Sequence, residues 1–290
     1  MKNWQKILLG TTAILAGFIG LLFWKGEPVY MNWTASKVPP QTIEERKALL
    51  APGVEIITPP GDGPFPLVLQ LHGCAGPRMS FQRDWAGEII TTGFAAMIVD
   101  STGPRGFSRQ KALEIVCQGK TLLGLERAGD ILAAIEIAKD DPRLDTSKII
   151  LAGWSHGAWT VMDFLTMDLD KHRPAGLSGD DFSIPEIEGT ILFYPYCGLG
   201  TLSRFREWTQ EPPTLALIGD ADEIVNAGEC VSLLGNRIKG GTPIDLKVYE
   251  GANHVFDDDF LEPEWHHWYN EDYALDAKKR VTAFLEERAN

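Results

Sequence analysis

The central segment of the chain reads Ile149-Ile150-Leu151-Ala152-Gly153-Trp154-Ser155-His156-Gly157, and a helical pattern, Ala158 to Met162, follows directly. An apolar run followed by G-x-S-x-G and a helix is typical of a sharp strand-to-helix turn that carries a nucleophilic serine. Backbone and side chains approach closely in such a turn, so the two flanking positions favour glycine. We therefore expect the Ser155 hydroxyl to stand free of the sheet, next to a backbone N–H at the start of a helix.

Strands and helices alternate along the rest of the chain. Buried or alternating apolar runs predict strands at 54–58, 66–71, 94–99, 149–152, 189–194, 214–218 and 244–249. Helical spacing is found at 41–50, 81–92, 122–139, 158–162, 225–238 and 274–287. This order predicts an α/β fold with a mostly parallel central sheet and helices on both faces.

The 290 residues carry a net charge of −13. So acidic a surface repels phosphate backbones, and we therefore expect no nucleic-acid partner. The sequence leaves the oligomeric state open.

The first 25 residues differ from the rest. Lys2 and Lys6 precede an uncharged run, 7–24, which as a helix would reach about 27 Å, close to the hydrocarbon thickness of a bilayer. This pattern predicts an uncleaved signal anchor at 1–25 that binds the membrane, with a signal peptide cleaved before secretion as the alternative. A linker and short helix at 26–50 and one catalytic domain at 51–290 would follow, held outside the cytoplasm in the periplasm of a bacterium.

The four cysteines support export. No C-x-x-C pair occurs among the cysteines, and no histidine lies at metal-ligand spacing from them; they are Cys74, Cys117, Cys197 and Cys230. We therefore expect no metal. No cofactor is expected either. An exported domain would oxidise the cysteines. Each of the pairs Cys74–Cys117 and Cys197–Cys230 lies near the carboxyl ends of neighbouring sheet elements, so we favour these disulfides. Four free thiols in a cytosolic enzyme are the alternative.

A serine nucleophile in such a sheet needs an acid and then a histidine later in the chain. The acid is expected in the turn after strand 214–218, where Asp222 is our choice and Asp220 the alternative. The histidine is expected in the loop after strand 244–249, which contains His254. His266 and His267 follow no strand, so we predict the triad Ser155, Asp222 and His254.

An oxyanion hole needs two backbone N–H groups aimed at the developing negative charge. One is expected from His156, which follows the nucleophile, and the other from Cys74 in the loop His72-Gly73-Cys74-Ala75-Gly76. Because only the main chain would be used, Cys74 could still form a disulfide. The side chain of His72 is expected to hold this loop in place.

Together these motifs resemble the dienelactone hydrolase family of the α/β-hydrolase superfamily. The resemblance also covers Val99-Asp100-Ser101, Pro104-Arg105-Gly106 and Gly251-Ala252-Asn253-His254-Val255-Phe256-Asp257, within about residues 50–290. It implies an α/β-hydrolase fold and hydrolysis of a small-molecule ester. The founding members use cysteine as nucleophile, so Ser155 points to carboxylesterase-like members. Arg105 would bind a substrate carboxylate by this analogy, or would hold a loop through backbone hydrogen bonds.

The substrate is less well defined by the sequence. Trp154 and Tyr194 are candidates to line the substrate pocket and could equally be core aromatics, while Trp265, Trp268, Tyr269 and Tyr273 could form a lid or rim or a packed surface insertion. Two other functions stay open: a serine peptidase of the prolyl-oligopeptidase type, and a non-catalytic, membrane-tethered binding module.

Overall fold

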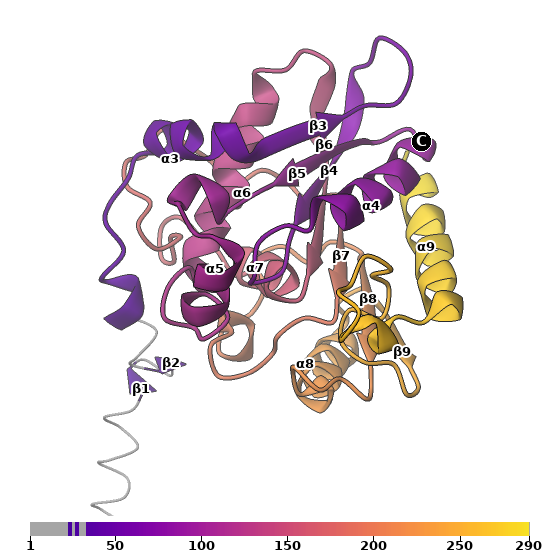
Figure 1. Cartoon of the computed structure of the whole chain (residues 1–290). Helices are drawn as coiled ribbons and strands as arrows, with labels where there is room; N and C mark the ends of the chain where they lie inside the picture. The colour runs from indigo at the N-terminus through magenta and orange to yellow at the C-terminus, as the bar shows by residue number, and fades with distance from the viewer. Residues whose placement is uncertain (1–22, 25–26, 29–32, 290) are drawn as a thin grey trace, which may run out of the picture.

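A seven-stranded sheet forms the centre of the molecule (Figure 1). The structure is a computed structural model that describes residues 23–24, 27–28 and 33–289. The strand order is β3-β5-β4-β6-β7-β8-β9. The strands are β3 (Val54–Ile57), β4 (Phe65–Leu71), β5 (Ala95–Val99), β6 (Leu144–Trp154), β7 (Gly189–Phe193), β8 (Thr214–Gly219) and β9 (Ile244–Tyr249).

All neighbouring strands are parallel except β3, which pairs antiparallel with β5 at one edge. In register, Leu71 of β4 lies opposite Gly153 of β6, and Trp154 lies opposite Phe193 of β7. The parallel strands therefore end along one edge of the sheet, and the loops that follow them can share a single site. The predicted mostly parallel sheet is confirmed.

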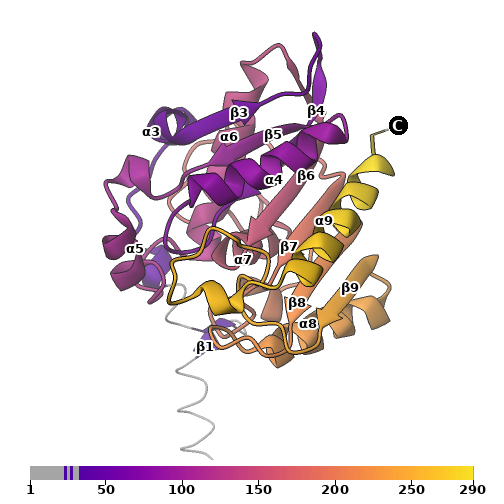
Figure 2. The same ribbon diagram turned by 45° about the vertical axis from the view of Figure 1, so that its right-hand side comes forward.

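Helices cover both faces of this sheet (Figure 2). Leu67, Leu69 and Leu71 of β4 point into a core shared with one set of helices, and Val68 points into a second core on the opposite face. The first core is closed by α3 (Ile43–Leu50), α6 (Gly124–Lys139), α7 (His156–Phe164) and α8 (Ala227–Gly240), and the second by α4 (Met79–Thr91) and α9 (Glu271–Glu286). Strand side chains alternate in direction, so one run of apolar residues fills two layers.

Two elements differ from the expectations. A short helix, α5 (Arg109–Ile115), lies where no helix was predicted, and Ser108 caps it by accepting a hydrogen bond from the Lys111 N–H. Strand β6 begins at Leu144, earlier than its apolar run, because the segment pairs with Phe65 and Pro66 of β4. Both features depend on neighbours that local periodicity does not reveal.

Most of the predicted anchor at 1–25 lies outside the described residues. Phe23 and Trp24, at its end, form the two-residue strand β1, which pairs with β2 (Glu27–Pro28). Among the residues that the structure describes, no helix has both the length and the apolar character needed to cross a membrane.

Candidate active site

Ser155 occupies the turn between β6 and α7 in a strained conformation. Its φ of 53° lies in the left-handed region, and its N–H donates to the Phe193 carbonyl at 2.9 Å. A side chain on Gly153 would collide with the backbone of Gly157, and one on Gly157 would collide with the Leu71 carbonyl. Both glycines are therefore required by close backbone packing, and the turn leaves Ser155 half-buried on the wall of a pocket.

His254 and Asp222 meet at the same edge of the sheet. The His254 Nδ1 lies 2.6 Å from Asp222 Oδ2, and both side chains are buried. Asp222 Oδ1 accepts hydrogen bonds from the N–H groups of Ile224 and Val225, at 2.8 Å each. These contacts orient the Asp222 carboxylate toward Nδ1 of His254 and leave Nε2 for the pocket, which both Ser155 and His254 line.

The alternative residues lie elsewhere. Asp220 Oδ1 accepts a hydrogen bond from the Gly251 N–H at 2.6 Å and so closes the loop after β9. His266 Nε2 lies 3.0 Å from Asp259 on the surface. The structure thus brings Asp222 and His254 together and does not bring Asp220 or His266 to them.

The two expected oxyanion donors flank Ser155. His156 is the first residue of α7, so its N–H points out of the helix start, while Cys74 lies in the loop after β4 and lines the pocket. Within the described residues, neither N–H donates to a backbone carbonyl. Both amides are therefore available to a ligand oxygen.

A buried network supports this region from the side of α6. Arg127 donates to the His72 carbonyl at 2.7 Å, and its Nη1 lies 3.2 Å from His156 Nδ1. His72 Nδ1 lies 2.6 Å from the Gly73 carbonyl, and its Nε2 accepts a hydrogen bond from the Ser101 N–H at 3.0 Å. Burial and the nearby Arg127 cation lower the pKa of His72 to about 4, so this ring is neutral and holds the loop.

A cavity of about 440 Å³ contains Ser155 and His254. Trp154 and Tyr194 contribute to its wall, yet both are almost fully buried. Trp265 and Trp268, from the loop between β9 and α9 that is gold in Figure 2, also line it. Tyr269 and Tyr273 are not among the lining residues, and the Tyr273 hydroxyl donates to the Glu250 carbonyl instead.

Arg105 is absent from this cavity, which corrects its expected contact with a substrate carboxylate. Its guanidinium donates to Asp130 at 2.7 and 3.0 Å and to the Ser101 carbonyl at 2.7 Å. Asp130 is fully buried, and Arg105 is the cation that compensates it together with Arg46. The second interpretation of Arg105, in which it holds a loop, agrees with this placement.

Sequence reasoning missed the role of Asp257. Its carboxyl group is buried and accepts hydrogen bonds from Tyr194 Oη at 2.8 Å, Trp85 Nε1 at 3.1 Å and Trp154 Nε1 at 3.2 Å. Burial raises the pKa of Asp257 to about 7. An acidic residue directly after the apolar pair Val255-Phe256 is the one signal in the sequence that could have identified it.

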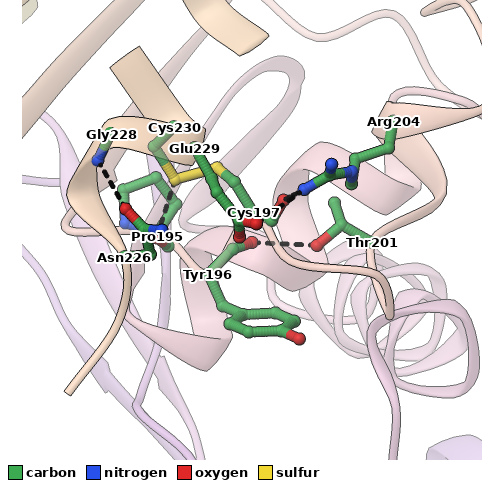
Figure 3. The surroundings of a disulfide bond; sticks show 9 residues. All are labelled: Pro195, Tyr196, Cys197, Thr201, Arg204, Asn226, Gly228, Glu229 and Cys230. Atoms are coloured by element: carbon green, nitrogen blue, oxygen red, sulfur yellow. Dashed lines mark hydrogen bonds and ion pairs between the residues drawn. A yellow bond between two sulfur atoms is a disulfide. The ribbon is translucent and has the colours of Figure 1, made fainter. Parts of the chain in front are cut away.

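Both expected disulfides are present. Cys74–Cys117 ties the loop after β4 to the segment after α5, and Cys197–Cys230 ties the loop after β7 to α8 (Figure 3). Arg204 adds a second link there, since it donates to the Cys197 carbonyl at 2.9 Å and pairs with Glu229 at 3.2 Å. Each disulfide therefore fixes a loop at the carboxyl edge of the sheet.

Comparison with known proteins supports the predicted resemblance. The model of the dienelactone hydrolase family matches residues 177–289, which confirms the predicted resemblance over this segment. The chain is also 30% identical over 152 residues to the human acylamino-acid-releasing enzyme. That match covers 51% of this chain and 19% of the relative, so the chain spans about a fifth of the length of that protein.

Solved structures show the same fold. A dienelactone hydrolase-like promiscuous phosphotriesterase from metagenomic libraries has a TM-score of 0.62 at 16% identity, over 82% of this chain and 92% of that chain. A thermophilic esterase of Thermogutta terrifontis has a TM-score of 0.56 at 18% identity, over 81% and 88%. The predicted α/β-hydrolase fold is thereby confirmed.

Proposed function

We propose that this chain, which has an α/β-hydrolase fold and matches the dienelactone hydrolase family over 177–289, is a serine hydrolase that cleaves carboxylic esters. The observation that carries the proposal is the 2.6 Å contact between His254 Nδ1 and Asp222, in a pocket that also contains the strained Ser155. Strain of this kind persists where the surrounding structure holds a reactive group in place.

In the proposed reaction His254 Nε2 takes the proton of Ser155 Oγ as that oxygen attacks the ester carbonyl carbon. The N–H groups of Cys74 and His156 stabilise the oxyanion of the tetrahedral intermediate. The bond to the alcohol oxygen then breaks, and that oxygen receives the proton from His254. Water then attacks the acyl carbon while His254 Nε2 takes its proton. The bond between the acyl carbon and Ser155 Oγ breaks, His254 returns the proton to Oγ, and the acid and the free serine are released.

The test is hydrolysis of p-nitrophenyl esters, acetate through decanoate, by the full chain and by Ser155→Ala. The variant should lose about 10⁴-fold or more in kcat, as triad nucleophiles do. Ser232→Ala, at an exposed position on α8, is the matched control and should retain full activity. Labelling by a fluorophosphonate should occur in the wild type and in Ser232→Ala and be absent from Ser155→Ala.

Two results would contradict the proposal. Turnover by Ser155→Ala at the wild-type rate would exclude this serine as nucleophile. Absence of labelling and turnover in the folded, oxidised protein would instead favour the non-catalytic binding module.

A second candidate is release of acylamino acids, the activity in the name of the human relative that is 30% identical over 152 residues. Hydrolysis of an N-acetyl-alanine anilide, compared with that of N-acetyl-alanine p-nitrophenyl ester, distinguishes the two. We compare two ratios of ester to anilide, one of kcat/KM and one of the uncatalysed hydrolysis rates. The kcat/KM ratio should be larger by at least about tenfold. The reverse order would favour a peptidase.

We also propose that the enzyme acts outside the cytoplasm, anchored by residues 1–25. The two disulfides support this location, because they persist in oxidising compartments. Residues 51–290 would form the catalytic domain. Fractionation of cells that express the full chain, with protease added to intact spheroplasts, should release the catalytic domain from the outer surface of the membrane.

A further inference from the structure

The cavity around Ser155 has an apolar side that remains open to solvent. Three of its lining residues are large apolar side chains with high exposure, namely Leu113 at 42%, Ile224 at 57% and Trp265 at 44%. They come from three separate segments: α5, the loop after β8 and the loop after β9. Exposed apolar side chains that converge on one concave site mark a place where an apolar ligand is bound.

The two arginines that line the same cavity are each paired with a carboxylate. Arg78 Nη2 lies 2.9 Å from Glu262 Oε2, and Arg78 also pairs with the buried Asp258. Arg109 Nη2 lies 3.6 Å from the other oxygen of Glu262. Glu262 therefore bridges both arginines, so a substrate carboxylate near either one would also lie near the Glu262 charge.

The lining as a whole is more acidic than basic. Its carboxylates are Asp258, Glu262 and Glu264, against the two arginines, and the full chain carries a net charge of −13. The lining therefore carries one carboxylate more than it has arginines, and a substrate carboxylate would add a like charge to this excess.

We propose that the substrate is an uncharged ester whose bulky apolar group lies against Leu113, Ile224 and Trp265, and that esters bearing a carboxylate are rejected by the carboxylates around Arg78 and Arg109. This inference rests on the proposed function and names the substrate class of the same site. Two separate features would cause this preference, namely the apolar mouth formed by Leu113, Ile224 and Trp265 and the bridge that Glu262 forms between the two arginines. Each can be changed by itself.

The test compares p-nitrophenyl hexanoate with mono-p-nitrophenyl adipate, which share a reacting carbonyl and chain length and differ in the terminal carboxylate. The full chain should hydrolyse the hexanoate with a kcat/KM at least about tenfold higher than that for the adipate. Glu262→Gln, which frees Arg109 and leaves Arg78 only Asp258, should reduce this ratio by at least about fivefold.

The apolar mouth is tested by Leu113→Ser. This variant should lower kcat/KM for the hexanoate by about fivefold relative to the acetate, mainly through KM. Leu275→Ser on α9, where the leucine is 58% exposed and outside the cavity, is the matched control and should leave the hexanoate-to-acetate ratio unchanged.

Equal or faster hydrolysis of the adipate would overturn the inference, and so would a Leu113→Ser variant with an unchanged chain-length preference. If the fluorophosphonate labels Ser155 and the acetate is hydrolysed in those cases, the proposed function stands and only the substrate class falls. Absence of labelling and of all ester turnover would remove both.

Discussion

Asp222 and Asp220 illustrate how two neighbouring carboxylates acquire different roles. Asp222 turns inward to His254 Nδ1 and to two backbone N–H groups, whereas Asp220 closes the loop after β9 through the Gly251 N–H. Only the first contact can fix the tautomer of a catalytic histidine and stabilise its cation.

The pair therefore gives a matched test at the residue scale. Asp222→Asn should lower kcat by about 10⁴-fold, because the amide would favour the wrong tautomer of His254. Asp220→Asn should change kcat by less than about tenfold, since only a loop hydrogen bond is weakened. Steady-state kinetics on one ester decides between them, and equal losses in the two variants would contradict the assignment of Asp222.

Asp257 connects the segments of Ser155 and His254 to the core. Trp154, one of its donors, directly precedes Ser155, and the ring of Tyr194, another donor, lies 4.6 Å from the His254 ring. Burial is the main cause that raises the pKa of Asp257 to about 7, and the neighbouring Asp258 charge acts in the same direction. The folded protein therefore holds a proton on Asp257 at pH values where the unfolded chain has lost it.

From this difference we predict the pH dependence of Asp257→Asn. Because the folded pKa is raised, the contribution of Asp257 to stability is greatest below about pH 4 and is lost as the pH rises through about 7. Relative to Asp257→Asn, wild type should lose about 2 kcal/mol of unfolding free energy between about pH 5 and about pH 8. Guanidinium unfolding at both pH values measures this, with Asp259→Asn at an exposed site as control. A pH-independent difference would contradict it.

At the scale of elements, the two disulfides close loops of similar length, but only one of the disulfides contains a residue that lines the pocket of Ser155. The separations are 43 residues for Cys74–Cys117 and 33 for Cys197–Cys230. Chain-entropy arguments assign both a similar stabilisation, about 2–4 kcal/mol. Cys74, however, lines the pocket of Ser155, in the loop proposed to supply an oxyanion donor, while Cys197 lies in the loop after β7 and is joined to α8 (Figure 3).

Replacing each pair by alanine should therefore separate stability from catalysis. Both double variants should lose comparable unfolding free energy, about 2–4 kcal/mol. Only Cys74→Ala with Cys117→Ala should also lower kcat, by about tenfold or more, because the Cys74 N–H is no longer held in position. Guanidinium unfolding and ester kinetics on the same samples provide the two readouts. A larger kcat loss in the Cys197–Cys230 variant would argue against the oxyanion role of the first loop.

The elements themselves were largely predictable, and their long-range partners were not. Strand β9 and helix α9 could be predicted because each has its own apolar period. Ser155 could be predicted because G-x-S-x-G between an apolar run and a helix is a local sequence motif. Asp257 accepts hydrogen bonds from residues 85, 154 and 194, which are far from it in the sequence. Arg105 donates to Asp130, which lies on α6. Such contacts arise only when the sheet has assembled, so no local pattern identifies them.

At the scale of the whole molecule, two buried polar networks flank the turn at Ser155. Asp257 and its aromatic donors lie with the core under α4 and α9. Arg127 with His72 and His156 lies behind the turn, on the side of α6 and α7. Burial is the main cause that lowers the pKa values of both histidines, and Arg127 acts in the same direction. The sheet therefore carries groups of opposite pH dependence on its two faces.

The histidine network predicts a loss of stability in acid. In the unfolded chain a histidine takes up its proton near pH 6.5, whereas folded His72 does so only at about 4. Its contribution is thus complete above about pH 6.5 and is lost as the pH falls toward about 4. Between about pH 7.5 and about pH 5 this amounts to about 2 kcal/mol for His72, and His156 adds a loss of the same sign.

Because Asp257 acts in the opposite direction, wild type alone does not isolate this effect, and a difference between variants is required. His72→Asn should be less stable than wild type at about pH 7.5, and this deficit should shrink by about 2 kcal/mol at about pH 5. Guanidinium unfolding at intermediate pH values measures the deficit, with exposed His266→Asn as the matched control. His156→Asn should show a trend of the same sign, which provides a second test if His72→Asn fails to fold. A deficit that grows toward acid in both variants would mean that these histidines are charged within the folded protein, contrary to the network that Arg127 forms with them.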